Sequence, residues 1–432
     1  MEKIEPNKPL SKFLITQAIF IGILFGGDNI FGFFEQNFFN TYLSHILGLE
    51  ELYISIMVSL SAAVGLVMNL TFGILSDNTR SSLGRRKPFF FVGGIIAGLA
   101  MILYAFTPNY ITAIILDVLI IGIASNAYYV TERALIPDSF DVEYRGRANS
   151  ILNIIGYIGL LTAIAGFIIA NEFFSVPNPS GDGTIIIQEG YLFVLTIGGG
   201  AFIICAIIGL LFIKEVPQEE LPVKKSFLEE FREIFDINEL RKNNEFFKLT
   251  LAYSIFRCGI GAMMPFLFIF IFSLGMSTVD LIFSILIGFP ILFIVISVLG
   301  RLSDQYGRKK YVPISILFVS IGIFFAVFVK NDTSVNLPLF YIVFPFILIG
   351  LLGLVTPLNA WAQDLLPEDK RGKFYGILNI IFTIPQIIGS MAAGIVASIA
   401  ILGIPWIFPL GSMWFLLSIL FFLRVKETLY IE

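Results

Sequence analysis

Twelve long apolar stretches govern what this chain can fold into. A helix that crosses the hydrocarbon core of a bilayer needs about 20 mostly apolar residues. Segments that meet this requirement lie near residues 13–43, 52–75, 88–106, 110–136, 148–171, 191–213, 247–274, 279–300, 311–329, 338–363, 374–400 and 405–424. Hydrophobic residues make up 57% of the chain and charged residues 14%, whereas about 25% of a soluble domain is charged. We therefore expect an all-α membrane protein with twelve transmembrane helices.

Lysine and arginine are distributed unevenly between these stretches. Of 28 such residues, 25 fall in the N-terminal tail and in alternate connecting segments, and only Lys330 falls in one of the other connections. Loops on the cytoplasmic side carry the excess of Lys and Arg in membrane proteins. We expect both termini to be cytoplasmic, in a multi-pass protein of the plasma membrane.

Three short motifs occur twice in the chain. The pairs are GILSD at 73–77 with GRLSD at 300–304, ALIPD at 134–138 with DLLPE at 364–368, and ILNII at 151–155 with ILNII at 377–381. Matching motifs in corresponding loops predict two six-helix pseudo-repeats. Secondary transporters are often built from such repeats, with the solute site near the midplane between them.

The repeats divide the chain into an N-terminal bundle at 1–213 and a C-terminal bundle at 247–432, joined by a cytoplasmic linker at 214–246. Apolar side chains recur in the linker at helical spacing, namely Phe227, Phe231, Ile234 and Phe235. This spacing predicts an amphipathic helix on the inner membrane face. An ordinary solvated linker is the alternative.

Several of these strings resemble a known family. The loops GILSD…GRR and GRLSD…GRK resemble the cytoplasmic signature of the major facilitator superfamily. Within it, SDNTRSSLGRRKPF at 76–89, RALIPD at 133–138 and GILNIIFTIPQIIGSMAAG at 376–394 resemble the glycoside–pentoside–hexuronide cation symporters, especially their sucrose–proton symporter branch. The resemblance implies the major facilitator fold and import of a sugar or glycoside by cation symport, with protons as the expected cation. The branch carries an Asp eleven residues before the helix-4 Arg, where this chain has Gly122.

The first apolar segment carries a polar stripe. Asp28 lies four residues before Gly32, and Glu35 and Gln36 lie three and four residues after it, which places all of them on one face of a helix. Ionisable side chains at membrane depth are expensive and usually face the bundle interior or a wet cavity. We expect Glu35 to hydrogen-bond sugar hydroxyls or to carry the coupled proton, and Asp28 and Gln36 to take part. A structural cap or an interhelical pair is the alternative.

The fourth apolar segment carries four polar candidates. Asn126 and Arg133 are seven residues apart and share a face, and the resemblance assigns Arg133 to substrate binding or coupling. An inner-gate ion pair or a snorkelling side chain is the alternative for Arg133. At 100° per residue, Asp117 falls about 160° from Arg133, so we expect it to contact a neighbouring helix or the outer vestibule. Glu132 is expected to pair elsewhere.

The second half offers fewer candidates. Arg257 could neutralise an acid on the first helix or bind an anionic solute. Asn379, Gln386 and Ser390 share a face of the eleventh segment, and Pro385 frees a backbone carbonyl there. Such a face could bind solute or allow a gating bend, and plain helix packing is the alternative.

The repeated loops form the predicted gate. A carboxylate at the end of a helix can accept from a neighbouring helix N-terminus and pair with arginine, and glycine allows a tight turn. The resemblance implies a latch that closes the inner side. The gating residues predicted on this basis are Asp77, Gly84, Arg85, Arg86, Asp304, Gly307 and Arg308.

The remaining composition excludes several classes of protein. One histidine and two cysteines, Cys205 and Cys258, are too few for a metal enzyme, and no GxxxxGK[ST] phosphate loop is present. We expect no enzyme activity, cofactor, metal or nucleic-acid partner, and a monomer. His45 is predicted to be exposed and without a role. An efflux or organic-anion (hexuronide) carrier on the same fold, and a non-transporting membrane sensor, remain as alternatives.

Overall fold

The fold is described from a computed structural model. It describes residues 11–179, 183–217, 219, 221, 224, 226–227, 244–331, 334–365, 371–399 and 401–427. Within these ranges the side chains of residues 142, 143, 304, 331, 334, 363 and 371–380 are not described. Most of the linker predicted to form an amphipathic helix therefore lies outside the described residues.

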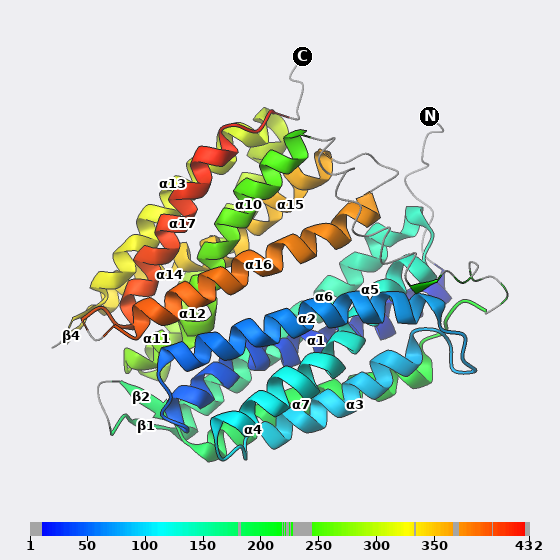
Figure 1. The fold of residues 1–432 in the computed structure, drawn as a ribbon, viewed down its shortest axis with the longest axis horizontal. Coiled ribbons are helices and arrows are strands. Elements are labelled where there is room, and N and C mark those ends of the chain that lie inside the picture. Colours follow the sequence, from blue (N-terminus) through cyan, green and yellow to red (C-terminus); the bar gives the residue numbers. More distant parts are fainter. Residues whose placement is uncertain are drawn as a thin grey trace. The chain divides into compact units, whose positions relative to one another are not determined.

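Helices dominate the first half of the chain (Figure 1). They are α1 (Lys12–His45), α2 (Glu51–Asn78), α3 (Lys87–Tyr104), α4 (Tyr110–Ile114), the π-helical η1 (Ile115–Ile121), α5 (Gly122–Ser139), α6 (Val142–Phe174) and α7 (Gln188–Phe212). A short two-stranded sheet of β1 (Ser175–Pro177) and β2 (Thr184–Ile186) connects α6 to α7.

The second half repeats this order. Its elements are α10 (Asn244–Met263), the 3₁₀ turn η3 (Met264–Phe266), α11 (Leu267–Ser273), α12 (Thr278–Tyr306), α13 (Arg308–Phe324), the 3₁₀ turn η4 (Phe325–Phe328), α14 (Leu337–Leu348), the π-helical η5 (Ile349–Gly353), α15 (Val355–Asp364), α16 (Arg371–Ala397), the 3₁₀ turn η7 (Ile404–Trp406) and α17 (Ile407–Phe422). The strands β3 (Lys330–Asn331) and β4 (Ser334–Val335) pair antiparallel between η4 and α14.

Eleven helices of the described chain are long and apolar enough to cross a membrane. They coincide with eleven of the twelve predicted segments. The twelfth, at 374–400, falls on α16, whose described side chains form the apolar stretch Ile381–Ala397. The all-helical architecture predicted from the sequence is confirmed.

The chain divides into two compact units. The first comprises Met1–Leu47, Val64–Ser175 and Ile186–Phe231, and the second comprises Gly48–Ala63, Val176–Ile185 and Arg232–Glu432, as far as these ranges are described.

The two units pack their helices in the same way. In the first unit α1 packs against α6 and α7, and α3 packs against α7 and α5. In the second unit α10 packs against α16 and α17, and α13 packs against α17 and α14. Because α10, α13, α16 and α17 are the counterparts of α1, α3, α6 and α7, this shared pattern is the spatial form of the sequence repeat.

Small residues set the spacing inside each unit. A Cβ placed on Gly98 of α3 would lie 2.5 Å from the carbonyl oxygen of Gly199 on α7, and one on Gly261 of α10 would lie 2.7 Å from Gln386 Cα on α16. Both separations are shorter than a van der Waals contact, so only glycine permits these backbones to meet. Close approach at small residues is how membrane helices gain packing energy.

Two of the helices contain a π-helical segment at corresponding positions. In the first unit η1 separates α4 from α5, and in the second η5 separates α14 from α15. A π-helical turn holds more residues than an α-helical turn, so it shifts the face on which the preceding residues lie. Such segments occur frequently at functional sites.

Candidate functional site

The first unit gathers polar side chains from α1 and α5. Tyr129 donates a hydrogen bond from its hydroxyl to Glu35 Oε2 at 3.1 Å. The guanidinium of Arg133 lies 5.7 Å from the centre of the Tyr129 ring. Arg133 is exposed, and Glu35 and Tyr129 are half-buried, so none of the three is sealed in dry packing. Two predicted residues are thus joined by one, Tyr129, that the sequence analysis missed.

Gly32 of α1 lies next to the polar side chains of this cluster. A Cβ placed on it would lie 3.8 Å from Asp28 Oδ1, 3.9 Å from Gln36 Nε2 and 3.9 Å from the Tyr129 hydroxyl. The glycine leaves room for three polar side chains to converge over one turn of α1. The predicted polar stripe of α1 is therefore a shared polar surface with α5.

Asn126 is bonded to α2 as well as to its own helix. It donates from Nδ2 to the Gly122 carbonyl oxygen at 2.6 Å, and its Oδ1 accepts from Asn69 Nδ2 at 2.5 Å. Asn126 is 8% exposed, whereas Asn69 is exposed. The amide that remains accessible for a solute is therefore that of Asn69, a residue that the sequence analysis did not single out.

A second group of charges lies beside the first. The charge of Asp28 interacts with those of Arg133 and Glu132. Asp28 is half-buried, whereas Glu132 is only 1% exposed. The expectation that Glu132 pairs away from Arg133 stays a prediction, because a shared charged neighbour does not show which partner Glu132 binds.

Asp117 lies closer to this group than its sequence spacing suggests. It is 4% exposed, and its charge interacts with that of Glu35 on α1. The predicted angle of about 160° from Arg133 assumed a continuous α-helix, but Asp117 lies inside η1. The π-helical turns change the angular relation between Asp117 and Arg133, so the angle of about 160° does not hold. The expected proximity of Asp117 to a neighbouring helix agrees with its interaction with Glu35 of α1.

In the second unit, Arg257 of α10 lies between aromatic rings. Its guanidinium is 5.9 Å from the Tyr253 ring centre and 5.3 Å from that of Phe382 on α16. Tyr253 in turn donates to Asn359 Oδ1 at 3.0 Å. The Nε of Arg257 is buried and has no hydrogen-bond partner among the described residues. Arg257 therefore retains a donor for a further acceptor.

The predicted face of α16 is only partly described. Gln386 is half-buried, and its backbone packs on Gly261 of α10. Ser390 is fully buried, and its hydroxyl has no partner among the described residues. The side chain of Asn379 lies outside the described residues, so its predicted role stays a prediction.

The first basic corner, as we call Ser76, Asp77, Gly84, Arg85, Arg86, Asp138 and Glu215, is a dense ionic network. Arg86 binds Asp77, Ser76 Oγ at 2.5 Å and Asp138 Oδ2 at 2.9 Å. Arg85 binds Asp138 Oδ1 at 2.5 Å. The side chain of Arg86 is 5% exposed, so this is a buried ionic junction between the end of α2, the start of α3 and α5.

A carboxylate from beyond α7 completes this corner. Glu215 accepts from the backbone N–H groups of Arg85 at 2.7 Å, Arg86 at 3.0 Å and Lys87 at 2.7 Å. These groups open α3, where free N–H donors and the helix dipole favour a negative charge. The predicted pairing of Asp77 with Arg86 is present, whereas the N-terminus of α3 is capped by Glu215 and not, as predicted, by Asp77.

The second basic corner, formed by Gly307, Arg308, Lys309, Asp364 and Glu427, repeats the capping. Glu427 accepts from the backbone N–H groups of Arg308 at 3.2 Å and Lys309 at 2.9 Å. Arg308 Nε binds Asp364 Oδ2 at 2.8 Å. The predicted partner Asp304 has no described side chain. A Lys-Glu pair after the last helix of each half, Lys214-Glu215 and Lys426-Glu427, was the available sequence signal for both caps.

His45 is not the exposed residue that the sequence predicts. Its Nδ1 accepts from the backbone N–H of Ile186 at 3.2 Å and lies 2.8 Å from the Tyr191 hydroxyl. The side chain is half-buried. His45 therefore fixes the end of α1 to β2 and to the start of α7, which is a structural role.

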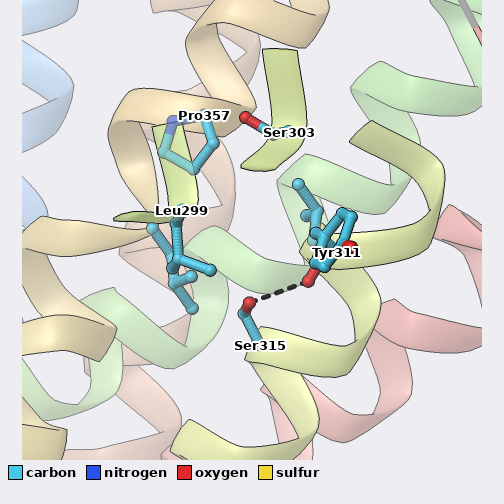
Figure 2. A pocket seen from close by; sticks show the side chains of 7 residues that line it. Leu299, Ser303, Tyr311, Ser315 and Pro357 are labelled. Atoms are coloured by element: carbon cyan, nitrogen blue, oxygen red, sulfur yellow. Dashed lines mark hydrogen bonds between the residues drawn. The ribbon is translucent and has the colours of Figure 1, made fainter. Parts of the chain in front are cut away.

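A small pocket lies beside the second basic corner (Figure 2). It has about 170 Å³ of empty space between α12, α13 and α15, open solvent included, and almost none of that space can admit a water molecule. One wall contains Ser315, which donates from Oγ to the Tyr311 carbonyl oxygen at 2.7 Å. The lining is Leu299, Ser303, Tyr311, Val312, Ser315, Leu354 and Pro357. This space is too small and too apolar to be the solute site.

Sequence comparison identifies the class of protein. The sequence profile of the Major Facilitator Superfamily matches residues 19–390 and, in a second alignment, residues 291–429. The match covers well over half of the chain, so the chain belongs to this superfamily. It is an integral, multi-pass membrane protein of a superfamily of transporters.

Solved structures share the fold. The nucleoside transporter NupG superimposes with a TM-score of 0.71 at 13% identity, over 96% of this chain and 99% of that chain. A D-xylose–proton symporter superimposes with a TM-score of 0.65 at 17% identity, over 96% of this chain and 98% of that chain. At these identities the likeness shows the fold alone.

Two curated relatives match a part of the chain. The class H tetracycline resistance protein of Pasteurella multocida is 32% identical over 133 residues, which are 30% of this chain and 31% of that protein. The general alpha-glucoside permease of Schizosaccharomyces pombe is 25% identical over 148 residues, which are 31% of this chain and 27% of that protein. The chain thus matches less than a third of the length of either relative.

Proposed function

We propose that this protein imports a sugar or glycoside by cation symport, with protons as the coupling cation and alternating access as the mechanism. The observation that carries the proposal is the partly accessible cluster of Glu35, Tyr129 and Arg133 in the first unit. A carboxylate and a guanidinium at membrane depth cost stability, so their presence there indicates a function.

The chemistry of the cluster suits a sugar. Sugar hydroxyls both donate and accept, so they can bond to the carboxylate of Glu35 and to the amides of Gln36 and Asn69. The planar fork of Arg133 can donate two parallel hydrogen bonds to neighbouring oxygens. The ring of Tyr129 adds an apolar face on which a pyranose can pack.

Glu35 can also carry the coupled proton. A carboxyl group in surroundings of low dielectric favours its neutral form, whereas the hydrogen bond from Tyr129 favours the ionised form. Such opposing influences allow the proton to be taken up and released. Coupling follows because protonation changes the relative stability of the two access states.

Two relatives support this class of solute. The D-xylose–proton symporter shares the fold, and the alpha-glucoside permease shares sequence over 31% of this chain. The resemblance of residues 76–89, 133–138 and 376–394 to sucrose–proton symporters points the same way.

The test is solute-induced alkalinisation of weakly buffered cells that produce the protein, screened over a panel of sugars. For a sugar that gives a signal, Glu35→Gln should abolish accumulation driven by a pH gradient while exchange of labelled sugar persists. Glu172→Gln changes an exposed glutamate of α6 in the same chemical way and should leave both assays unchanged. Undiminished accumulation in Glu35→Gln would exclude Glu35 as the proton carrier, and no signal from any sugar would exclude the substrate class.

We propose for the gate that the two basic corners hold the cytoplasmic ends of their own helices in register while the bundles at 1–213 and 247–432 change access. Their buried ion pairs and capped helix ends support this role. Disulfide cross-linking or spin-label distance measurements between the helix ends, in wild type and in Arg86→Ala, would test this role of the corners.

An anionic solute is the second candidate, and one observation favours it. Arg257 lies on two aromatic rings and has a buried Nε without a partner among the described residues. A carboxylate on a hexuronide would satisfy that donor. If glucuronate competes for uptake more strongly than glucose, and Arg257→Gln removes the difference, the carrier is one for organic anions.

A further inference from the structure

Glu132 is a buried carboxylate with an unsatisfied oxygen. Its side chain is 1% exposed, and Oε2 is buried without a hydrogen-bond partner among the described residues. An ionised carboxylate oxygen that lacks both water and a donor is strongly unfavourable. A protonated carboxyl group avoids this penalty, because its neutral form needs no counter-charge.

Two acids compete for one base at this position. The charges of Asp28 and Glu132 interact with each other, and both interact with Arg133. If both acids were ionised, the three groups would carry a net negative charge, although Glu132 is withdrawn from water. A neighbouring like charge favours protonation of one member of such a pair. Asp28 is half-buried and accessible to water, so the proton belongs on Glu132.

The membrane spans of α3 and α7 supply no competing cation. Between Lys87 and Tyr104, α3 has no ionisable residue, and Cys205 is the only one between Tyr191 and Lys214 on α7.

On α5 itself, Tyr128 donates its hydroxyl to the Leu24 carbonyl oxygen at 2.9 Å. On α6, Arg145 is committed to the carbonyl oxygens of Pro137 and Phe140, and the remaining ionisable groups of this helix are Glu143, Tyr144, Arg147, Tyr157 and Glu172. Arg133 is the cation whose charge interacts with both acids.

We propose that Glu132 is a proton-binding residue of the coupling machinery. Glu132 is neutral while Arg133 pairs with Asp28, and it gives up its proton when Arg133 turns to it. A proton from water forms the O–H bond at Oε2. That bond breaks when the guanidinium replaces it as the partner of Glu132, and the proton returns to water. Asp28 then stays ionised, because its side chain is accessible to water. This inference rests on the proposed function for its role in transport, but not for its protonation.

The protonation is tested without any solute. The protein is reconstituted in lipid vesicles, and the infrared carbonyl band of protonated carboxylic acids is recorded at neutral pH. Glu132→Gln should remove a component of this band, and Glu172→Gln should not. A band unchanged by Glu132→Gln would overturn the proposal.

A second variant tests the competition. Asp28→Asn removes the rival acid, so Arg133 should pair with Glu132 and the same component should disappear although Glu132 is present. Its persistence in Asp28→Asn would overturn the exchange of partners. This variant also keeps the test decisive should Glu132→Gln fail to fold.

The role in transport has its own readout. With a sugar identified as above, Glu132→Gln should exchange labelled sugar at the wild-type rate and lose the pH dependence of accumulation. A wild-type pH profile in Glu132→Gln would overturn the coupling role. If no sugar is transported, the proposed function fails while the infrared result still decides the protonation of Glu132.

Discussion

The two basic corners share a backbone arrangement and differ in their side-chain networks. In each, a glycine precedes the helix and a glutamate from beyond the last helix of the unit accepts from the first N–H groups. The position of Arg86 in the first corner is that of Lys309 in the second. Arg86 binds three side chains, whereas Lys309 contributes its backbone N–H to the described contacts.

This difference separates the features that both repeats keep, the turn and the helix cap, from the side-chain network, which differs between them. The turn and the cap are needed to start a helix, so both units retain them. The planar fork of arginine permits several simultaneous bonds, which lysine does not provide. Among the described side chains, the first corner therefore has more charged contacts than the second. The predictions that follow test whether this difference has energetic consequences.

The largest effect is expected for Arg86→Ala. It leaves Asp77 and the mostly buried Asp138 without one of their partners, and breaking a buried charge network costs on the order of 3 kcal/mol. Lys309→Ala should change the unfolding free energy by less than about 0.5 kcal/mol, as surface substitutions do. Reversible unfolding in mixed detergent micelles measures both. Equal losses at the two positions would show that the contrast between the corners has no energetic meaning.

The next effect is expected to be the same in both corners. Gly84 and Gly307 have φ angles of 117° and 94°, a region that residues with a Cβ rarely adopt. A Cβ on Gly84 would also lie 2.6 Å from Glu215 Oε1. Gly84→Ala and Gly307→Ala should each cost about 2 kcal/mol in unfolding free energy because of this strain.

Gly200 provides the matched control for both glycines. A Cβ there meets nothing within 4 Å, and the residue lies inside α7. Gly200→Ala should be neutral or stabilise by about 0.5 kcal/mol, because alanine favours a helix. If Gly84→Ala behaves like Gly200→Ala, the turn does not depend on glycine.

Much of this molecule is predictable from its sequence because the membrane imposes simple rules. Apolar length predicts the helices, and the repeated motifs predict the equivalence of α1 with α10 and of α3 with α13. The polar stripe of α1 is also confirmed, since periodicity alone places Asp28, Gln36 and Gly32 together.

The failures have two causes: a local departure from α-helical geometry, and contacts distant in sequence, which follow no period. The π-helical η1 turns Asp117 by an amount that no α-helical wheel includes. Glu215 and Glu427 reach their partners across more than a hundred residues. Tyr129 could have been found, because it lies four residues before Arg133 and shares its face.

The smallest effect is expected for the capping glutamates. Glu215→Gln keeps one oxygen acceptor but removes the charge from a helix N-terminus, which is worth about 0.3–1 kcal/mol. Glu215 serves three N–H groups and Glu427 serves two, so Glu427→Gln should cost less. Because the effect is electrostatic, the loss in Glu215→Gln should shrink at high salt. A loss that is independent of salt would mean that the carboxylate acts by geometry and not by charge, and the two corners would then differ only in the side chain at the position of Arg86.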